Sequence, residues 1–158
     1  MVNLSILTGY LGKHIKDICT NKYVNDADNH CAHFVSHVMG YTFGLTCRVM
    51  GQAIGPGANL RVQEVFPKCP QVGTWASRPT SVTTCLAFIT NPANVNLAGK
   101  VFHNVPRKHI GIYCGEVIWH YSNRDRKVVK QTPGQFSHHY AAPDNAMFYG
   151  TLPSDVVT

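Results

Sequence analysis

The sequence predicts an α+β domain, because helical patterns fill its first half and short strand patterns fill its second half. A first amphipathic helix is indicated near the N-terminus by apolar residues at helical spacing. These residues are Leu4, Leu7, Leu11, Ile15 and Ile18. The chain has 158 residues, a length that suits one hydrophobic core, and we expect residues 1–158 to form a single domain.

A second helix is predicted from about Asn29 to Met39, with Gly40 as its stop. Asp26, Asp28 and Asn29 precede this helix, and their side chains are good acceptors for the free amides of a first helical turn. A Gly-rich loop follows, and it lacks the Lys-Ser/Thr ending of a phosphate-binding loop. Residues 59–66 then predict a short helix with Asn59 as its cap.

The second half of the chain changes to short runs of β-branched and aromatic residues separated by turn residues. These runs predict strands at 83–90, 109–115, 116–122, 126–132 and 146–152. A tight hairpin is expected at Cys114–Glu116, and one or more helical turns are expected at 132–140 with Thr132 as cap. Helices followed by a meander of antiparallel strands are typical of an α+β domain.

Net charge is +6, and six of the fourteen Lys and Arg residues lie between Arg107 and Lys130. Charge alone favours a solvated basic face, and no nucleic-acid motif is recognised, so we expect no nucleic-acid partner. No apolar run is long enough to span a bilayer, which argues against stable membrane insertion. The N-terminal residues lack the features of a secretory signal peptide, so we expect synthesis in the cytoplasm and reduced thiols.

The segment DADNHCAHFVSHVMGY, residues 26–41, places one cysteine among three histidines. Cys31 falls in the first turn of the second predicted helix, where unpaired amides and the helix dipole favour negative charge. Such a location favours the thiolate, and the same amides, including that of Ala32, can stabilise an oxyanion. The sequence therefore predicts a nucleophilic Cys31.

A nucleophilic cysteine needs a base, which usually comes from another part of the fold. His109 opens one predicted strand and His120 lies within the next. Across a hairpin at 114–116 these two histidines lie on neighbouring strands at nearly the same level. One can accept the thiol proton, and the other can fix the tautomer and orientation of the first imidazole.

The segments HCAHFVSHV and KHIGIYCGEVIWH together resemble the NlpC-type papain-like cell-wall cysteine peptidases and amidases. In that family a cysteine opens a helix, a histidine heads a strand of the pattern H-hydrophobic-G-hydrophobic-aromatic, and a third polar residue lies on the next strand. The resemblance implies a papain-like fold with Cys31 as nucleophile, His109 as base and His120 as the orienting residue. It also implies that Tyr23 helps to shape the oxyanion hole.

The resemblance further implies that the chain hydrolyses an amide bond in peptidoglycan stem peptides or crosslinks, without a cofactor or metal. A catalytic domain without a signal peptide that acts on cell wall needs a specialised export route. This requirement is met by an antibacterial effector injected into rival bacteria or by a phage lysis enzyme. An injected effector would have a cognate immunity protein as partner.

Two alternatives use the same residues differently. The fold and nucleophile can instead serve acyl transfer to an amine or a lipid acceptor. A non-enzymatic module is the other alternative, because His33 and His37 face one side of a helix at a spacing that can bind zinc. In that case His30, His109 or His120 would complete the ligand set.

Overall fold

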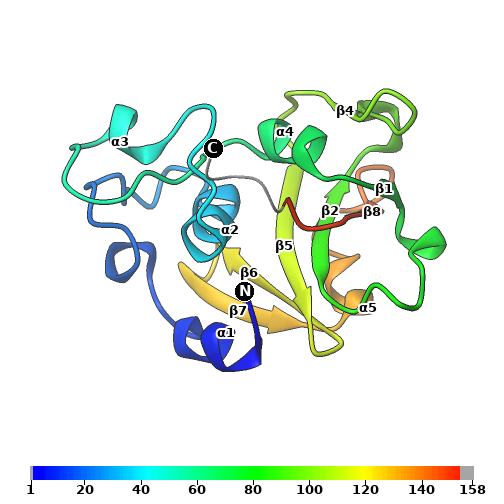
Figure 1. Cartoon of the computed structure of the whole chain (residues 1–158), viewed down its shortest axis with the longest axis horizontal. Coiled ribbons are helices and arrows are strands. Elements are labelled where there is room, and N and C mark those ends of the chain that lie inside the picture. The colour runs from blue at the N-terminus through cyan, green and yellow to red at the C-terminus, as the bar shows by residue number, and fades with distance from the viewer. Residues whose placement is uncertain (1, 154–158) are drawn as a thin grey trace.

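The computed structural model describes residues 2–153 and has an α+β architecture, in which a mostly antiparallel sheet is covered by helices (Figure 1). The predicted fold class is confirmed at this level. The helices are α1 (Leu4–Tyr10), α2 (Cys31–Met39), α3 (Cys47–Met50), α4 (Val62–Val65) and α5 (Pro133–Phe136), with 3-10 turns η1 (Ile15–Asp17), η2 (Phe66–Lys68), η3 (Trp75–Ser77) and η4 (Pro92–Asn94). In the described part of the chain, no helix has the length and apolarity that a membrane crossing requires.

Six strands form the main sheet, and each pairs antiparallel with its neighbours. Their order across the sheet is β1 (Val72–Thr74), β8 (Ala146–Gly150), β2 (Cys85–Thr90), β5 (Lys108–Cys114), β6 (Val117–Ser122) and β7 (Lys127–Gln131). A separate two-stranded ladder joins β3 (Val95–Asn96) to β4 (Val101–Phe102). The five predicted strands correspond to β2, β5, β6, β7 and β8, whereas β1, β3 and β4 are too short to show a period.

The first predicted helix is wrong as a continuous element, because α1 ends at Tyr10 and the chain turns before η1. Gly12 adopts a left-handed φ of +82°, which breaks the helix. Its amide donates to the carbonyl of Val128, and the amide of Val128 donates to the carbonyl of Lys13. The backbone at this break therefore pairs with the outer edge of β7 instead of continuing α1.

The second predicted helix is confirmed as α2, which begins at Cys31 and ends where Gly40 takes a left-handed φ of +76°. Asn29 stabilises the start of α2, because its Oδ1 accepts a hydrogen bond from the Cys31 amide at 2.9 Å. Asp26 does not cap α2 and pairs instead with His14 at 2.6 Å.

The two other predicted helices are also present, and both are short. The helix predicted at 59–66 shrinks to the four residues of α4. Thr132 caps α5 as predicted, in a reciprocal capping box with Gln135. This box fixes the start of α5 directly after β7.

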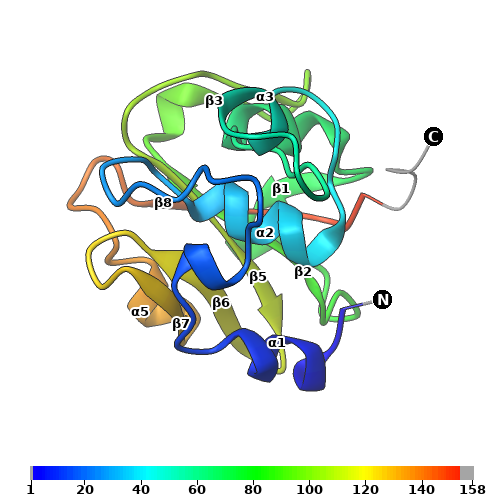
Figure 2. The same cartoon turned by 90° about the vertical axis from the view of Figure 1, so that its left-hand side faces the viewer.

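Each face of the sheet has its own apolar cluster, and the two faces position the site. On one face α2 packs against β5 and β6, and Cys31 shares a core with Ile110 and Ile112. On the other face Tyr113 packs with Phe136 of α5. Figures 1 and 2 show α2 and α5 on different sides of β6. Because side chains alternate along a strand, neighbouring residues of β5 point to opposite faces.

Candidate active site

Cys31 is the first residue of α2, and a pair of asparagines fixes this helix start. Asn29 Oδ1 accepts both the Cys31 amide at 2.9 Å and Asn123 Nδ2 at 3.1 Å. Asn123 Oδ1 in turn accepts the amide of His30 at 2.9 Å. Since Asn123 lies in the turn between β6 and β7, these bonds hold the cysteine end of α2 against the sheet.

The Cys31 sulfur is nearly enclosed, because the residue is only 2% exposed. Burial raises the pKa of the Cys31 thiol to about 11. The backbone amides of Ile110 and Ala32 and the charge of Lys108 oppose this rise, because each stabilises the thiolate. The resting group is therefore a neutral thiol, and it needs a base to become a nucleophile.

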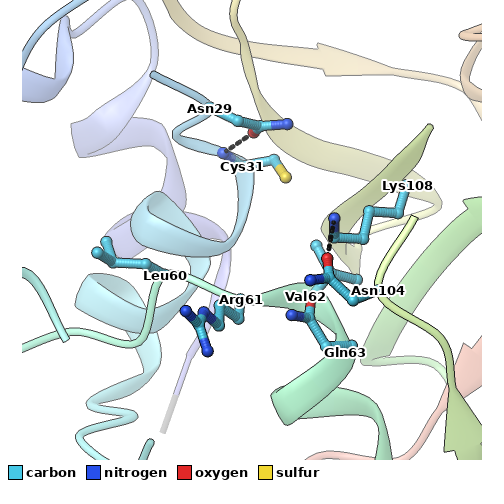
Figure 3. A pocket seen from close by; sticks show the side chains of 8 residues that line it. All are labelled: Asn29, Cys31, Leu60, Arg61, Val62, Gln63, Asn104 and Lys108. Atoms are coloured by element: carbon cyan, nitrogen blue, oxygen red, sulfur yellow. Dashed lines mark hydrogen bonds between the residues drawn. The ribbon is translucent and has the colours of Figure 1, made fainter. Parts of the chain in front are cut away.

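A pocket of about 120 Å³ opens beside the sulfur. Figure 3 shows the eight residues that line it, with the Cys31 sulfur on the side that faces Asn104 and Lys108. They are Asn29, Cys31, Leu60, Arg61, Val62, Gln63, Asn104 and Lys108. Two of these residues are cationic and none carries a carboxylate, so the pocket favours a ligand with negative charge.

Two polar side chains of this pocket, Lys108 and Gln63, can contact a ligand. Lys108 Nζ donates to Asn104 Oδ1 at 3.0 Å and to the carbonyl of Val105 at 2.6 Å, while burial lowers the pKa of Lys108. Gln63 Oε1 is buried and has no hydrogen-bond partner. A buried acceptor without a partner costs free energy, so a ligand N–H directed at Gln63 would recover a hydrogen bond.

On the other face of β5, a chain of hydrogen bonds fixes the tautomers of His109 and His120. His120 Nε2 donates to Gln131 Oε1 at 2.7 Å, because an amide oxygen can only accept. His120 Nδ1 must then accept from His109 Nε2, at 2.9 Å. His109 Nδ1 is left without a proton, and this buried atom has no hydrogen-bond partner among residues 2–153. This chain of hydrogen bonds, which joins His109, His120 and Gln131 and is called the relay below, therefore leaves one imidazole lone pair free, as a general base requires.

Both imidazoles of the relay are kept neutral by their surroundings. Burial lowers the pKa of His109 well below its usual value, and the neighbouring His120 and His139 add to this shift. Burial also lowers the pKa of His120 to about 4. The His139 ring stacks on His109 with centroids 3.9 Å apart, and Phe136 packs against both relay histidines. These rings enclose His109, whereas His120 and Gln131 also line a pocket of about 430 Å³ on this face of the sheet.

The structure brings two of the three predicted catalytic residues into direct contact. His109 and His120 are neighbours across the β5–β6 hairpin, as predicted. The predicted hydrogen bond between Cys31 and His109 is not formed among the described residues. Strand alternation explains this, since Ile110 points toward α2 and His109 points to the opposite face. The sulfur reaches β5 at the amide of Ile110, the residue directly after His109.

The thiol and the imidazole also do not share a pocket. His109 is fully buried and does not line the pocket beside Cys31. Tyr23 lies outside that pocket too, because its ring packs against His30 and His33 with centroids 5.7 and 5.6 Å away. The amide of Ala32, by contrast, faces the sulfur as an oxyanion donor would.

Gln131 is the functional candidate that sequence reasoning missed, and spacing alone could have found it. His109, His120 and Gln131 follow one another at equal intervals along two successive hairpins. In the register of β6 and β7, His120 is opposite Val129 and Gln131 is opposite Ile118, so His120 and Gln131 are diagonal neighbours on one face, within reach of long side chains. No regular spacing in the sequence indicates Lys108 or Gln63, because they line the Cys31 pocket only through the packing of α4 and β5 on α2.

Two groups of side chains have a composition and proximity that suit a metal ion. One is the row of His109, His120 and His139, in which the first two imidazoles already hydrogen bond each other. The other group combines His33 and His37 with two cysteines, Cys19 and Cys47, that sequence reasoning did not join to them. Comparison of the chain with models of protein families, with curated proteins and with solved structures found no match.

Proposed function

We propose that the chain is a cysteine hydrolase that cleaves an amide bond through a thioester at Cys31. The observation that carries this proposal is the relay from Gln131 through His120, which leaves His109 Nδ1 free to accept a proton. This imidazole lies on the opposite face of β5 from the Cys31 sulfur, so catalysis requires a rearrangement that brings the two groups together. The finer fold that we propose is papain-like, as in the NlpC-type peptidases that the sequence resembles.

In the first step, His109 Nδ1 accepts the proton of the Cys31 thiol while the sulfur attacks the substrate carbonyl carbon. His120 and Gln131 hold the imidazole in the required tautomer and stabilise the imidazolium that forms. The tetrahedral intermediate then collapses, the C–N bond breaks, and the imidazolium gives its proton to the leaving amine. The acyl group remains on sulfur as a thioester.

In the second step, water attacks the thioester carbonyl and gives a proton to His109. The C–S bond breaks, the proton returns to sulfur, and the carboxylic acid leaves. In both steps the amide of Ala32 beside the sulfur stabilises the oxyanion, because the amides of His30 and Cys31 are already bonded to Asn123 and Asn29. The proton transfer requires a rearrangement that brings the Cys31 sulfur and the His109 ring to one side of the sheet, because in the structure they lie on opposite faces of β5.

Peptidoglycan stem peptides or crosslinks are the substrate class that we propose. These peptides carry free carboxylates, and the pocket beside Cys31 has Arg61 and Lys108 on its wall with no acidic residue. Gln63 Oε1, which lacks a partner in the same wall, can accept a peptide N–H. The NlpC-type resemblance points to the same substrates.

The test uses purified peptidoglycan and three proteins: wild type, Cys31→Ala, and the control Cys85→Ala. Cys85 is also a buried cysteine, but it packs on the α5 face of the sheet. Mass spectrometry of the muropeptides should show new cleavage products with wild type and Cys85→Ala. Folded Cys31→Ala should lose roughly 10³-fold or more of this activity. Retained activity in Cys31→Ala would overturn the nucleophile.

A second readout separates the nucleophile from the substrate. A peptide that carries a chloroacetamide group should alkylate wild-type protein at Cys31 faster than at the other buried cysteines, as shown by intact mass and peptide mapping. If this labelling occurs but peptidoglycan stays intact, the substrate class is wrong and the nucleophile stands. If Cys31 shows no preferential labelling, the enzyme proposal fails.

A further inference from the structure

Two cysteines and two histidines converge on the α2 side of the molecule, away from the relay histidines. The ligand atoms of Cys19, His33, His37 and Cys47 all lie within 4.8 Å of one another. His33 and His37 are one helical turn apart on α2, Cys19 follows η1, and Cys47 is the first residue of α3. Two thiols with two imidazoles are a ligand set of structural zinc sites.

The spacing of these atoms is close to that of a tetrahedral site. With zinc–sulfur and zinc–nitrogen bonds of about 2.3 and 2.0 to 2.1 Å, neighbouring ligand atoms lie about 3.3 to 3.8 Å apart. His37 Nε2 and Cys47 Sγ are already 3.7 Å apart. Small side-chain rotations are therefore sufficient to seat an ion among the four.

Hydrogen bonds outside the cluster fix the tautomer of His33 as a metal ligand requires. His30 Nε2 lies 2.7 Å from the carbonyl oxygen of Asn25 and must donate to it. Neutral His30 then accepts at Nδ1, so His33 Nδ1 donates to it at 3.0 Å. His33 Nε2 is left with a lone pair, and in the described part of the chain this fully buried atom has no hydrogen-bond partner. A hydrogen bond at the ring nitrogen that does not bind the metal orients most metal-binding histidines in this way.

Both sulfurs accept hydrogen bonds from N–H groups, which stabilise thiolates. Cys19 Sγ accepts the amide of Asn21 at 3.4 Å. Cys47 Sγ accepts Asn21 Nδ2 at 3.1 Å and the amide of Ala58 at 3.3 Å. Asn21 also donates from Nδ2 to the carbonyl of Pro56, so it ties the Gly-rich loop to the same cluster.

We propose that Cys19, His33, His37 and Cys47 bind one zinc ion in a closed structural site. Four protein ligands leave no open position, so the ion stabilises the fold and takes no part in chemistry. Binding releases the two thiol protons, because zinc is held by thiolates. The ion joins the segment after η1, the middle of α2 and the loop that carries α3, which lies beside α2 in Figure 1. This proposal does not depend on the proposed enzyme activity.

The test begins with the metal content of the purified wild-type protein after dialysis against a weak chelator. Elemental analysis should give one zinc per chain, and X-ray absorption at the zinc edge should show two sulfurs at about 2.3 Å and two nitrogens at about 2.0 to 2.1 Å. Cys47→Ser should lose the zinc, whereas Cys114→Ser, a control at another buried cysteine, should keep it. Stripping the zinc should lower the thermal midpoint by roughly 10 °C or more.

Four outcomes would overturn the proposal. The first is wild-type protein without zinc that also fails to take up one equivalent when zinc is added under reducing conditions. The second is an all-nitrogen ligand shell, which would assign the ion to the row of His109, His120 and His139. The third is a Cys19–Cys47 disulfide in protein purified anaerobically. The last is full zinc content in Cys47→Ser; if that variant does not fold, the wild-type absorption spectrum still decides the ligand set.

Discussion

Each face of the sheet carries a group of histidines, and the two groups differ in where their lone pairs point. On the α2 side, His33 Nδ1 donates a hydrogen bond to His30, so Nε2 carries the free lone pair of a residue that groups with His37 and two cysteines. On the other side, His109 donates to His120, and the imidazoles bond to each other in a row that ends at Gln131. The first arrangement suits a cation, and the second suits proton transfer.

This difference shows that a histidine count does not identify a site. Two imidazoles in one group and three in the other offer ligand atoms within 4.8 Å of one another, and both groups are largely buried. The hydrogen bond at the second ring nitrogen decides which atom of each imidazole remains free. The same substitution made in each group should therefore remove a different property, activity in one group and zinc binding in the other.

The largest effect is expected from the same substitution placed in each group. His109→Gln keeps a donor for His120 but removes the base, so peptidoglycan cleavage should fall about 10² to 10⁴-fold while zinc content stays at one per chain. His33→Gln should lose most of its zinc and melt roughly 10 °C or more below wild type. Muropeptide analysis, elemental analysis and thermal melts are measured on both variants. A loss of zinc in His109→Gln would contradict the separation of the two groups.

A smaller effect is expected at the end of the relay. Gln131→Ala removes the acceptor that fixes the His120 tautomer, and activity should fall about 10 to 100-fold with zinc unchanged. Gln131→Glu should restore most of the activity, because its carboxylate can accept the same bond. Gln71→Ala is the matched control, since Gln71 is exposed and precedes β1, at the opposite end of the sheet from β7. Equal activity losses in Gln131→Glu and Gln131→Ala would show that a hydrogen-bond acceptor at residue 131 does not determine the activity.

The strand half of the molecule was predictable from local pattern. Alternating and β-branched runs gave β2, β5, β6, β7 and β8, and the tight turn at Gly115–Glu116 gave the hairpin that pairs His109 with His120. What local pattern could not give is the face on which each strand residue lies. The helix that covers β5 selects the side of Ile110, and this choice separates the His109 ring from the Cys31 thiol.

The N-terminal half was less predictable, because the path of its backbone depends on contacts between segments that are distant in the sequence. The first amphipathic pattern continues past Gly12, but the chain turns there to pair with Val128. Cys19 and Cys47 lie in irregular segments on either side of α2, and nothing in their spacing indicates His33 and His37. Packing that brings irregular segments onto a helix leaves no period in the sequence.

The smallest effects are expected from two glycine substitutions that test how closely the relay strands must approach. A Cβ on Gly111 would lie 2.6 Å from Ile118 Cγ2 and 3.0 Å from the carbonyl oxygen of Trp119, so β6 has to shift away from β5. Gly111→Ala should lower the free energy of unfolding by about 1 to 3 kcal/mol in urea titrations.

Gly134→Ala is the matched control for this prediction, because it makes the same change in α5. A Cβ there meets nothing nearer than Thr132 Oγ1 at 3.9 Å. The change should leave stability equal or raise it by up to about 1 kcal/mol, because alanine is favoured over glycine within a helix. Equal stability of Gly111→Ala and wild type would mean that β5 and β6 can separate without cost. The contact between His109 and His120 would then not depend on their close approach.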